Sequence, residues 1–322
     1  MTITEQLETI VGPRFKENEP MSKHTNFRIG GPAKWFVEVR TIEELVHVLK
    51  IAEENSIETF VFGGGSNMLV SDAGFDGIVI KMAMRAYSIE GNKVRAETGV
   101  LSAALARATA NSGRKGLTWA ISLPGTVGGG VRGNAGCFGG EMRDHLVMVE
   151  VLRDGKIIEL SKEELEFGYR ESVIKHSKDI VLAATFELEE GDTDDLKMEL
   201  ADKLMKRKES QPQDAGSAGC LFKNYEIESD GELQRLQEKL DIPAEMSNGR
   251  RLSAGWLIDN LDLKGMKIGK AQISDVHGNF LVNTGEATAD EVVQLIALVK
   301  TRARDQYGIL LKEEVQYVGF NS

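Results

Sequence analysis

The stretch SLPGTVGGGVRGNAGCFGGE, residues 122–141, contains eight glycines among its twenty residues. Glycine loses more conformational freedom on folding than other residues and offers no side chain to pack, so central strands and buried helices disfavour such a run. A shorter loop, GGGSN at 63–67, directly follows a predicted strand at 57–62. Both loops indicate places where another group must approach the backbone closely.

Several interpretations of these two glycine loops are open. Gly128, Gly130 and Gly133 satisfy the dinucleotide pattern G-x-G-x-x-G, but Pro124 and Gly125 interrupt the strand that should precede it. No G-K-[ST] follows either loop, which excludes a Walker A phosphate loop. Alternatively, two separate loops present backbone N–H groups to one diphosphate. Plain turns are the structural alternative, although two dense loops, each with an asparagine close behind, make it less attractive.

Length, charge and cysteine content limit the class of protein. A chain of 322 residues favours two or three domains. The net charge of −11 and the lack of a long basic block disfavour binding to nucleic acid or to an anionic membrane. No run of eighteen apolar residues and no secretory signal are visible, and two cysteines fit a reducing compartment. We therefore expect a cytoplasmic protein with small-molecule ligands and no obligate protein partner.

Helical and strand patterns mix without a steady βαβ rhythm, which favours α+β domains over a doubly wound sheet. Capping-box spacing marks two helix starts, Thr41 with Glu44 and Thr288 with Glu291. A shift to charged composition predicts a domain boundary near 192. The predicted helices cover 41–56, 101–113, 192–212 and 289–308, and the predicted strands 57–62, 77–82, 179–191 and 309–319, with hairpins at 87–97 and 146–160.

Eight motifs follow one another between His24 and Gly319: HTNFRIGGPA, GGGSNMLVSD, PGTVGGGVRGNAGCFGGE, YRES, SAGCLFKN, GWLIDNLDLKG, HGNFLVNTGEATADEV and KEEVQYVG. Their order resembles that of the UDP-N-acetylenolpyruvoylglucosamine reductases, flavoenzymes that make UDP-N-acetylmuramate for peptidoglycan. The resemblance covers nearly the whole chain. The short distance from YRES to CLFKN is similar to the shorter type of this family, which lacks an extra tyrosine-bearing loop over the substrate.

The resemblance implies a fold and two cofactors. An FAD-binding domain like that of vanillyl-alcohol oxidase (PCMH-like) would have two parts, residues 1–80 with 306–322 and residues 81–192. Residues 193–305 would form an α+β substrate-binding domain. NADPH would reduce the FAD and leave, and the UDP-sugar would then use the same cleft. The implied FAD contacts are Gly63, Gly64, Gly65, Ser66, Asn67, Pro124, Gly125, Thr126, Gly128, Gly129, Asn134 and Gly136.

The implied reaction adds hydride to the terminal carbon of an enolpyruvyl ether, which leaves an enolate whose carbon must be protonated. The site therefore needs groups that face the enolate oxygens and a proton donor. Arg170 matches the family's enolate-stabilising arginine, and its fork of donors suits a carboxylate. Tyr169 would lie near the substrate, and Glu314 matches the second enolate-stabilising residue. By themselves, Arg170 would read as a surface arginine and Tyr169 as a core aromatic. The implied substrate contacts are Lys223 and Asn224, with Lys208 as a further candidate.

Several positions depart from the family pattern, among them Gly130 and Cys137, where alanines are common. Cys220 stands where many members have the serine that protonates the enolate carbon. Alone, a cysteine is often a small buried hydrophobe. In this motif we interpret it as the general acid, because a thiol with a pKa near ~8.5 is protonated at neutral pH and is more acidic than an alcohol. Tyr225 replaces a usual proline and opens an acidic insertion, 225–250, predicted as an extra helix and loop, and KEEV replaces a usual Glu-Pro-Glu-Val.

The choice between Glu313 and Glu314 sets strand alternation against the family match. One face of the predicted strand 309–319 carries Ile309, Leu311, Glu313, Val315 and Tyr317. Alternation alone therefore marks Glu313 as the buried acid. The offset from Val315 and Gly319 selects Glu314, and a bulge or a polar-facing cleft would remove the conflict.

A metal site and two rival functions have less support in the sequence than the reductase reaction that the resemblance implies. Five scattered histidines without metal-ligand spacing predict no metal site, and we assign His24 and His277 no catalytic part. An FAD-dependent oxidase or dehydrogenase acting on a small hydroxy acid would have no reason to carry YRES, CLFKN and EEV together. A non-catalytic flavin- or nucleotide-sugar-binding module would not need Arg170 and Glu314.

Overall fold

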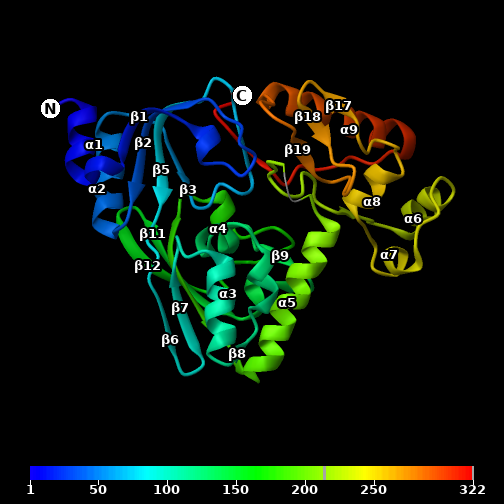
Figure 1. Ribbon diagram of the computed structural model, residues 1–322, viewed down its shortest axis with the longest axis horizontal. Coiled ribbons are helices and arrows are strands. Elements are labelled where there is room, and N and C mark those ends of the chain that lie inside the picture. The colour runs from blue at the N-terminus through cyan, green and yellow to red at the C-terminus, as the bar shows by residue number, and fades with distance from the viewer. Residues whose placement is uncertain (213–214, 321–322) are drawn as a thin grey trace. The chain divides into compact units, whose positions relative to one another are not determined.

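The computed structural model describes residues 1–212 and 215–320, and its chain forms two compact units (Figure 1). Unit 1 comprises residues 1–19, 32–65 and 75–209. Unit 2 comprises residues 20–31 and 66–74 and the chain from 210 onward. Residues 193–209 thus group with unit 1, whereas the three-part division implied by the resemblance stays a prediction.

Unit 1 contains a four-stranded sheet with the strand order β1-β2-β5-β3. Its strands are β1 (Phe15–Pro20), β2 (Pro32–Val39), β3 (Thr59–Phe62) and β5 (Phe75–Met82), of which β2 and β3 pair parallel with β5. Helices α1 (Ile3–Val11) and α2 (Ile42–Glu54) share an apolar core with this sheet. The predicted capping box of α2 is half formed. The Glu44 N–H donates to Thr41, whereas the Glu44 carboxylate accepts from the Arg40 N–H and the Arg14 guanidinium.

A second sheet of unit 1 is antiparallel, in the order β12-β11-β13-β7-β6. It consists of β6 (Tyr87–Glu90), β7 (Lys93–Glu97), β11 (Leu146–Arg153), β12 (Lys156–Ser161) and β13 (Ile180–Glu187). Both predicted hairpins are confirmed, and Asp154 and Gly155 both have positive φ, as a type I′ turn requires. The core behind the sheet includes residues of α3 (Ser102–Asn111), α4 (Val127–Arg132) and α5 (Thr193–Ser210). Short pairs join β8 (Arg114–Lys115) to β14 (Glu189–Glu190) and β9 (Gly136–Cys137) to β10 (Gly140–Glu141).

Unit 2 is built around a short antiparallel sheet of β17 (Lys267–Ile268), β18 (Ala271–Ile273) and β19 (Leu281–Asn283). Helices α8 (Ala254–Asp259) and α9 (Ala289–Tyr307) share its apolar core. The capping box of α9 at Thr288 is fully formed, and the left-handed Gly308 (φ +71°) ends the helix. Strand β4 (Met68–Val70) pairs parallel with β20 (Gln316–Val318).

Two sequence expectations need correction in unit 2. The insertion holds two short helices, α6 (Asp230–Gln237) and α7 (Ala244–Asn248), between the paired strands β15 (Tyr225–Glu226) and β16 (Arg251–Leu252). The expected strand 309–319 is a strand only at β20, preceded by an isolated bridge at Glu313. The buried positions there step from Val315 to Val318, and Tyr317 is 41% exposed. Strict alternation therefore fails, because the extended segment changes its facing side before β20.

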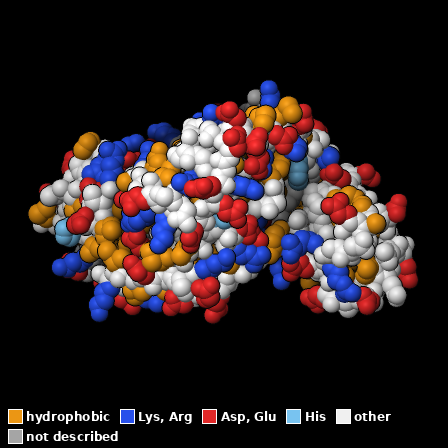
Figure 2. Space-filling model, turned by 90° about the horizontal axis from the view of Figure 1, so that it is seen from below, with side chains coloured by type: hydrophobic (Ala, Val, Ile, Leu, Met, Phe, Trp, Pro, Cys, Tyr) orange, Lys and Arg blue, Asp and Glu red, His pale blue; other side chains and the backbone are white. Residues whose placement is uncertain are grey.

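The surface carries both signs of charge. On the face drawn in Figure 2, acidic and basic side chains are interspersed. Within residues 1–212 and 215–320, no helix is both long and apolar enough to cross a membrane.

Candidate active site

The two glycine loops of unit 1 lie directly against each other. A Cβ atom on Gly63 would lie 2.1 Å from Thr126 Oγ1, and one on Gly64 would lie 2.7 Å from the Gly125 Cα. A Cβ on Gly128 would lie 1.9 Å from Thr98 Oγ1. These distances are too short for any side chain, so the glycines are needed where the loops meet.

Backbone hydrogen bonds from the first two residues of α4 fix the second glycine loop. Val127 N–H donates to Val100 O (2.8 Å), and Gly128 N–H donates to Thr98 O (2.9 Å). The hydroxyl of Thr126 is buried between these bonds and has no hydrogen-bond partner in the part of the chain that the structure describes. A buried hydroxyl without a partner is costly, and a bound polar group would satisfy it. This loop pair therefore fits a cofactor that carries phosphates.

The side chain of Asn134 is committed to the protein itself. It is fully buried, with φ +41°, a left-handed conformation that asparagine tolerates. Its Nδ2 donates to Glu141 Oε2 (2.6 Å) and to Gly168 O (2.8 Å), and its Oδ1 accepts from Arg143 N–H (3.1 Å). The amide of Asn134 thus joins the glycine loop to the segment that carries YRES, and its predicted contact with FAD stays a prediction.

Residues 168–171, which overlap the YRES motif, form a tight turn, and Arg170 is the third residue of this turn. Gly168 and Glu171 exchange backbone hydrogen bonds of 3.1 and 3.3 Å across the turn. Arg170 has φ +58°. Its Nη2 donates to Gly136 O of the glycine loop (2.7 Å), and its guanidinium lies 5.2 Å from the Tyr169 ring centre. Unit 1 thus brings Tyr169 and Arg170 together with the second glycine loop.

Unit 2 brings Cys220 and Glu314 onto neighbouring segments. Phe222 pairs antiparallel with Glu313, and Glu314 N–H donates to Leu221 O (2.7 Å). The same CLFKN segment also pairs with a second segment, because Cys220 forms an antiparallel bridge with Phe280. The CLFKN segment therefore lies between the KEEV segment and residues 279–280.

A buried amide holds the CLFKN segment in this place. Asn279 is 2% exposed, and its Oδ1 accepts from Phe222 N–H (2.9 Å) while its Nδ2 donates to Phe222 O (2.8 Å). Asn279 N–H in turn donates to His277 Nδ1 (3.1 Å), and desolvation lowers the pKa of this imidazole. The sequence reasoning missed Asn279, although the HGNF motif contains it.

The structure accounts for both glutamates of KEEV. Glu313, which strand alternation marks as the buried acid, receives a hydrogen bond from Lys300 of α9 at 2.8 Å. The backbone of Glu314 is bonded on both sides, because its N–H donates to Leu221 O and its carbonyl accepts from Asn67 Nδ2 (3.1 Å). Glu313 thus has a partner in α9, and the choice of Glu314 as the second enolate-stabilising residue stays a prediction.

The remaining predicted contacts are divided between the units. Asn224 Oδ1 accepts from Ala254 N–H (3.1 Å) in the first turn of α8, and Lys223 N–H donates to Lys312 O (2.9 Å). Ser66 and Asn67 follow the first glycine loop but belong to unit 2. Lys208 lies exposed on α5 of unit 1.

Two charged groups near the second glycine loop were not predicted. The guanidinium of Arg132 is largely buried, burial lowers its pKa, and its Nη2 donates to Lys175 O (3.3 Å). Arg143 pairs with Glu141 (2.7 Å) next to Asn134. Both arginines follow the glycines closely in sequence, which is the signal that could have found them.

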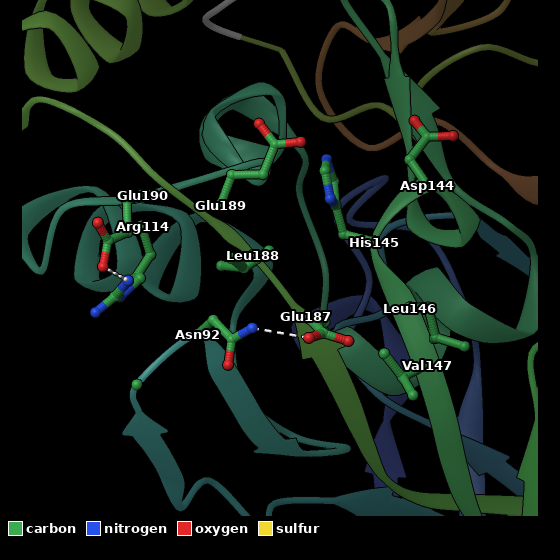
Figure 3. Close-up of a pocket in the computed structure, with 11 residues that line it drawn as sticks. Asn92, Arg114, Asp144, His145, Leu146, Val147, Glu187, Leu188, Glu189 and Glu190 are labelled. Carbon is green, nitrogen blue, oxygen red and sulfur yellow. Dashed lines mark hydrogen bonds and ion pairs between the residues drawn. The ribbon is translucent and has the colours of Figure 1, made fainter.

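A pocket of about 820 Å³ in unit 1 is drawn in Figure 3. It reaches the end of the second glycine loop, because Asp144 in its lining accepts a hydrogen bond from the Glu141 N–H (2.8 Å). Its lining includes Asp144, His145 and Glu189, while Asn92 donates to Glu187 (2.7 Å). None of the predicted site residues lines it. Within the described ranges, no group of three or more His, Cys, Asp or Glu residues could hold a metal ion.

Comparison with known proteins covers both units. Residues 33–161, which include both glycine loops, match the model of an FAD binding domain, and residues 211–318 match the C-terminal domain of UDP-N-acetylenolpyruvoylglucosamine reductase. A reductase of that name from Clostridioides difficile is 38% identical over 307 residues, covering 94% of this chain and 93% of the relative. The chain belongs to the UDP-N-acetylenolpyruvoylglucosamine reductase family.

Other members of the reductase family agree with this assignment. The reductase from Clostridium novyi is 37% identical and covers 99% of this chain and 97% of its own length. The crystal structure of the reductase from Thermus caldophilus matches with a TM-score of 0.75 and 34% identity, over 94% of this chain and 98% of that one. The predicted family and the predicted α+β fold, with an FAD-binding domain and a C-terminal reductase domain, are confirmed.

Proposed function

We propose that this chain reduces UDP-N-acetylglucosamine enolpyruvate to UDP-N-acetylmuramate, with FAD as the bound cofactor and NADPH as the reductant, in peptidoglycan precursor synthesis. The observation that carries the proposal is the pairing of CLFKN with KEEV in a member of this reductase family. It sets Cys220 and Glu314 on hydrogen-bonded neighbouring segments. An oxidase of the same flavin fold has no use for this pair.

The two glycine loops would hold the FAD. Their touching backbones and the unpartnered Thr126 hydroxyl support this assignment. When bound, FAD supplies hydride transfer from NADPH to the substrate. The backbone at Gly63–Gly65 and Gly125–Gly129 would position it by letting the cofactor approach closely. The N–H groups of Val127 and Gly128 donate to carbonyls of the protein and so hold the loop in place.

Three side chains would act on the substrate once hydride has reached the terminal enolpyruvyl carbon. The new C–H bond displaces the double-bond electrons onto the adjacent carbon and its carboxylate. The guanidinium of Arg170 would donate to the carboxylate oxygens, and Glu314 would be the second stabilising group. The Cys220 thiol would then give its proton to the carbanionic carbon and recover one from solvent. Lys223 and Asn224 would contact the UDP-sugar, with Lys208 as a further candidate, and Tyr169 would lie beside it.

Anaerobic flavin absorbance tests this function directly. NADPH is added until the flavin bleaches, and UDP-N-acetylglucosamine enolpyruvate follows. Return of the colour only with this substrate supports both half-reactions. A flavin that bleaches and stays reduced contradicts the proposed substrate, and protein purified without flavin contradicts the role of the glycine loops. We place the reaction in the cytoplasm, as two cysteines in 322 residues would suit.

A further inference from the structure

The backbone of Arg170 adopts a conformation that its residue type disfavours. Arg170 is the third residue of the turn from Gly168 to Glu171 and has φ +58°. Glycine or asparagine usually occupies such a position, because a β-carbon there crowds the neighbouring carbonyl. A side chain as large as arginine stays in that region only when its surroundings fix it. Contacts from the rest of unit 1 must therefore hold this turn.

Three side chains from the end of the second glycine loop hold the segment that leads into the turn. Asn134 Nδ2 donates to Gly168 O (2.8 Å), and Arg143 Nη1 reaches Phe167 O in a longer contact of 3.5 Å. Glu141 joins the two donors, because its Oε2 accepts from Asn134 (2.6 Å) and its Oε1 accepts from Arg143 Nη2 (2.7 Å). Arg143 N–H closes the ring by donating to Asn134 Oδ1 (3.1 Å).

Two of the three side chains in this ring of hydrogen bonds are buried or half-buried. Asn134 is fully buried, and the side chain of Glu141 is 24% exposed. Hydrogen bonds to a charged group in such a partly dry environment are stronger than those in water. Arg170 itself donates to Gly136 O (2.7 Å), so the start of the turn and its guanidinium are both fixed to one loop.

We propose that Asn134, Glu141 and Arg143, here called the Asn134 network, position Arg170 for its action on the substrate. The network holds the carbonyls of Phe167 and Gly168 and thereby sets the direction in which the turn presents the guanidinium. The inference rests on the proposed function, because it needs Arg170 to face the enolate. It makes Asn134 a positioning residue rather than a ligand of FAD through its side chain.

Two variants remove the network without forcing the backbone. Asn134→Gly deletes the amide and keeps φ +41° accessible, since glycine populates that region freely. Glu141→Gln keeps the side-chain volume and removes the charge that pairs with Arg143. The matched control is Glu189→Gln, an exposed carboxylate of the same unit. Arg170→Ala is the reference for complete loss of the guanidinium.

The two half-reactions separate positioning from cofactor binding. We expect both network variants to keep their FAD content and to bleach with NADPH within about twofold of wild type. Reoxidation by UDP-N-acetylglucosamine enolpyruvate should slow by about 10- to 100-fold. Asn134→Gly combined with Arg170→Ala should be no more than about twofold slower than Arg170→Ala alone, because coupled residues are not additive. Loss of FAD, or equal slowing of both half-reactions, would overturn the proposal.

A second readout does not depend on turnover. Hydrogen exchange in the purified protein should show the amides of Gly168 and Glu171 exchanging about 10-fold faster in Asn134→Gly and unchanged in Glu189→Gln. Unchanged exchange in Asn134→Gly would refute the network as the holder of the turn. If wild-type enzyme is not reoxidised by the substrate, the proposed function fails, and the exchange result still decides whether the network holds the turn.

Discussion

Cys220 is the proposed proton donor of this chain. A thiol can donate a proton as serine does, but it can also be oxidised. We expect Cys220→Ser to keep substrate-driven flavin reoxidation within about tenfold of wild type and to resist mild peroxide. Cys220→Ala should slow that step by about 100-fold or more. Normal turnover by Cys220→Ala would show that another group supplies the proton.

The other cysteine provides the control for peroxide sensitivity. Desolvation raises the pKa of Cys137, and its Sγ lies 3.4 Å from Trp119 O. A half-buried thiol that stays protonated is a poor target for oxidation. Cys137→Ser should therefore inactivate with peroxide as fast as wild type, with recovery by thiol reductant.

Gly63 illustrates a requirement that is steric rather than conformational. A Cβ atom there would lie 2.1 Å from Thr126 Oγ1, so Gly63→Ala must push the two glycine loops apart. We expect a fall in FAD content, measured by the flavin-to-protein absorbance ratio, together with a lower melting temperature. Gly231→Ala in α6, where a Cβ meets nothing within 4 Å, should retain full FAD and gain slightly in stability. Equal FAD content in the two variants would contradict the loop-contact argument.

At single positions, a surrounding motif indicated which residues are candidates for the site. The contacts that those residues make could not be predicted. The motifs pointed to Arg170, Cys220 and Glu314, and these roles stay predictions. Strand alternation pointed to Glu313, whose contact with Lys300 of α9 no local pattern indicates. The commitment of Asn134 to Glu141 and Gly168 could not be read either. Those partners lie in loops that meet it only after folding.

At the scale of elements, Tyr225 fastens the insertion of this chain. Its hydroxyl donates to Glu232 of α6 (2.5 Å). Burial and the Glu232 carboxylate raise the pKa of Tyr225 to about 12. The folded form thus holds this proton more tightly than the unfolded form, whose pKa is about 10. The contribution of the protonated Tyr225 hydroxyl to the free energy of unfolding is therefore complete below pH 10 and is lost as the pH rises toward 12.

Ultraviolet titration and proteolysis test the Tyr225 anchor. The absorbance difference between wild type and Tyr225→Phe should show one phenol titrating near pH 12. Cleavage within residues 226–250 should be faster in Tyr225→Phe at pH 8, and this difference should shrink above pH 11. Tyr87→Phe, which alters an exposed tyrosine of β6, should leave cleavage unchanged. A Tyr225 phenol that titrates near 10 would refute the anchor.

Elements defined by neighbouring residues were predictable, and those that depend on distant partners were not. The hairpin at Asp154 and Gly155 and the capping box at Thr288 each depend on a few residues that are close in sequence. Both formed as predicted. Strand β20 pairs with β4, far away in sequence, so its start and facing could not be derived from 309–319 alone. The insertion folded as two helices rather than one. Pro243 stands at the N-cap of α7, and a proline there prevents α6 and α7 from forming one continuous helix.

At the scale of the whole molecule, unit 2 depends on the β4–β20 pair. Val70 and Val318 face each other in this pair and are both buried. Val318→Asp would bury an unpaired charge, and we expect it to cost about 2–4 kcal/mol of unfolding free energy by chemical denaturation. Tyr317→Thr, at an exposed position of the same strand, should change stability by less than about 1 kcal/mol. Similar losses in the two variants would contradict a structural role for the pair.

The separation of β4 from β20 also has a consequence for how cells make this protein. A ribosome adds about 5–20 residues per second, and most of the chain is translated between the two strands. During that interval the apolar segment Met68–Val70 emerges without the strand that will pair with it. A nascent chain in this state exposes an apolar segment whose backbone N–H and C=O groups are unpaired, and chaperones bind surfaces of this kind. Production of active enzyme should therefore depend on chaperone supply more than its final stability suggests.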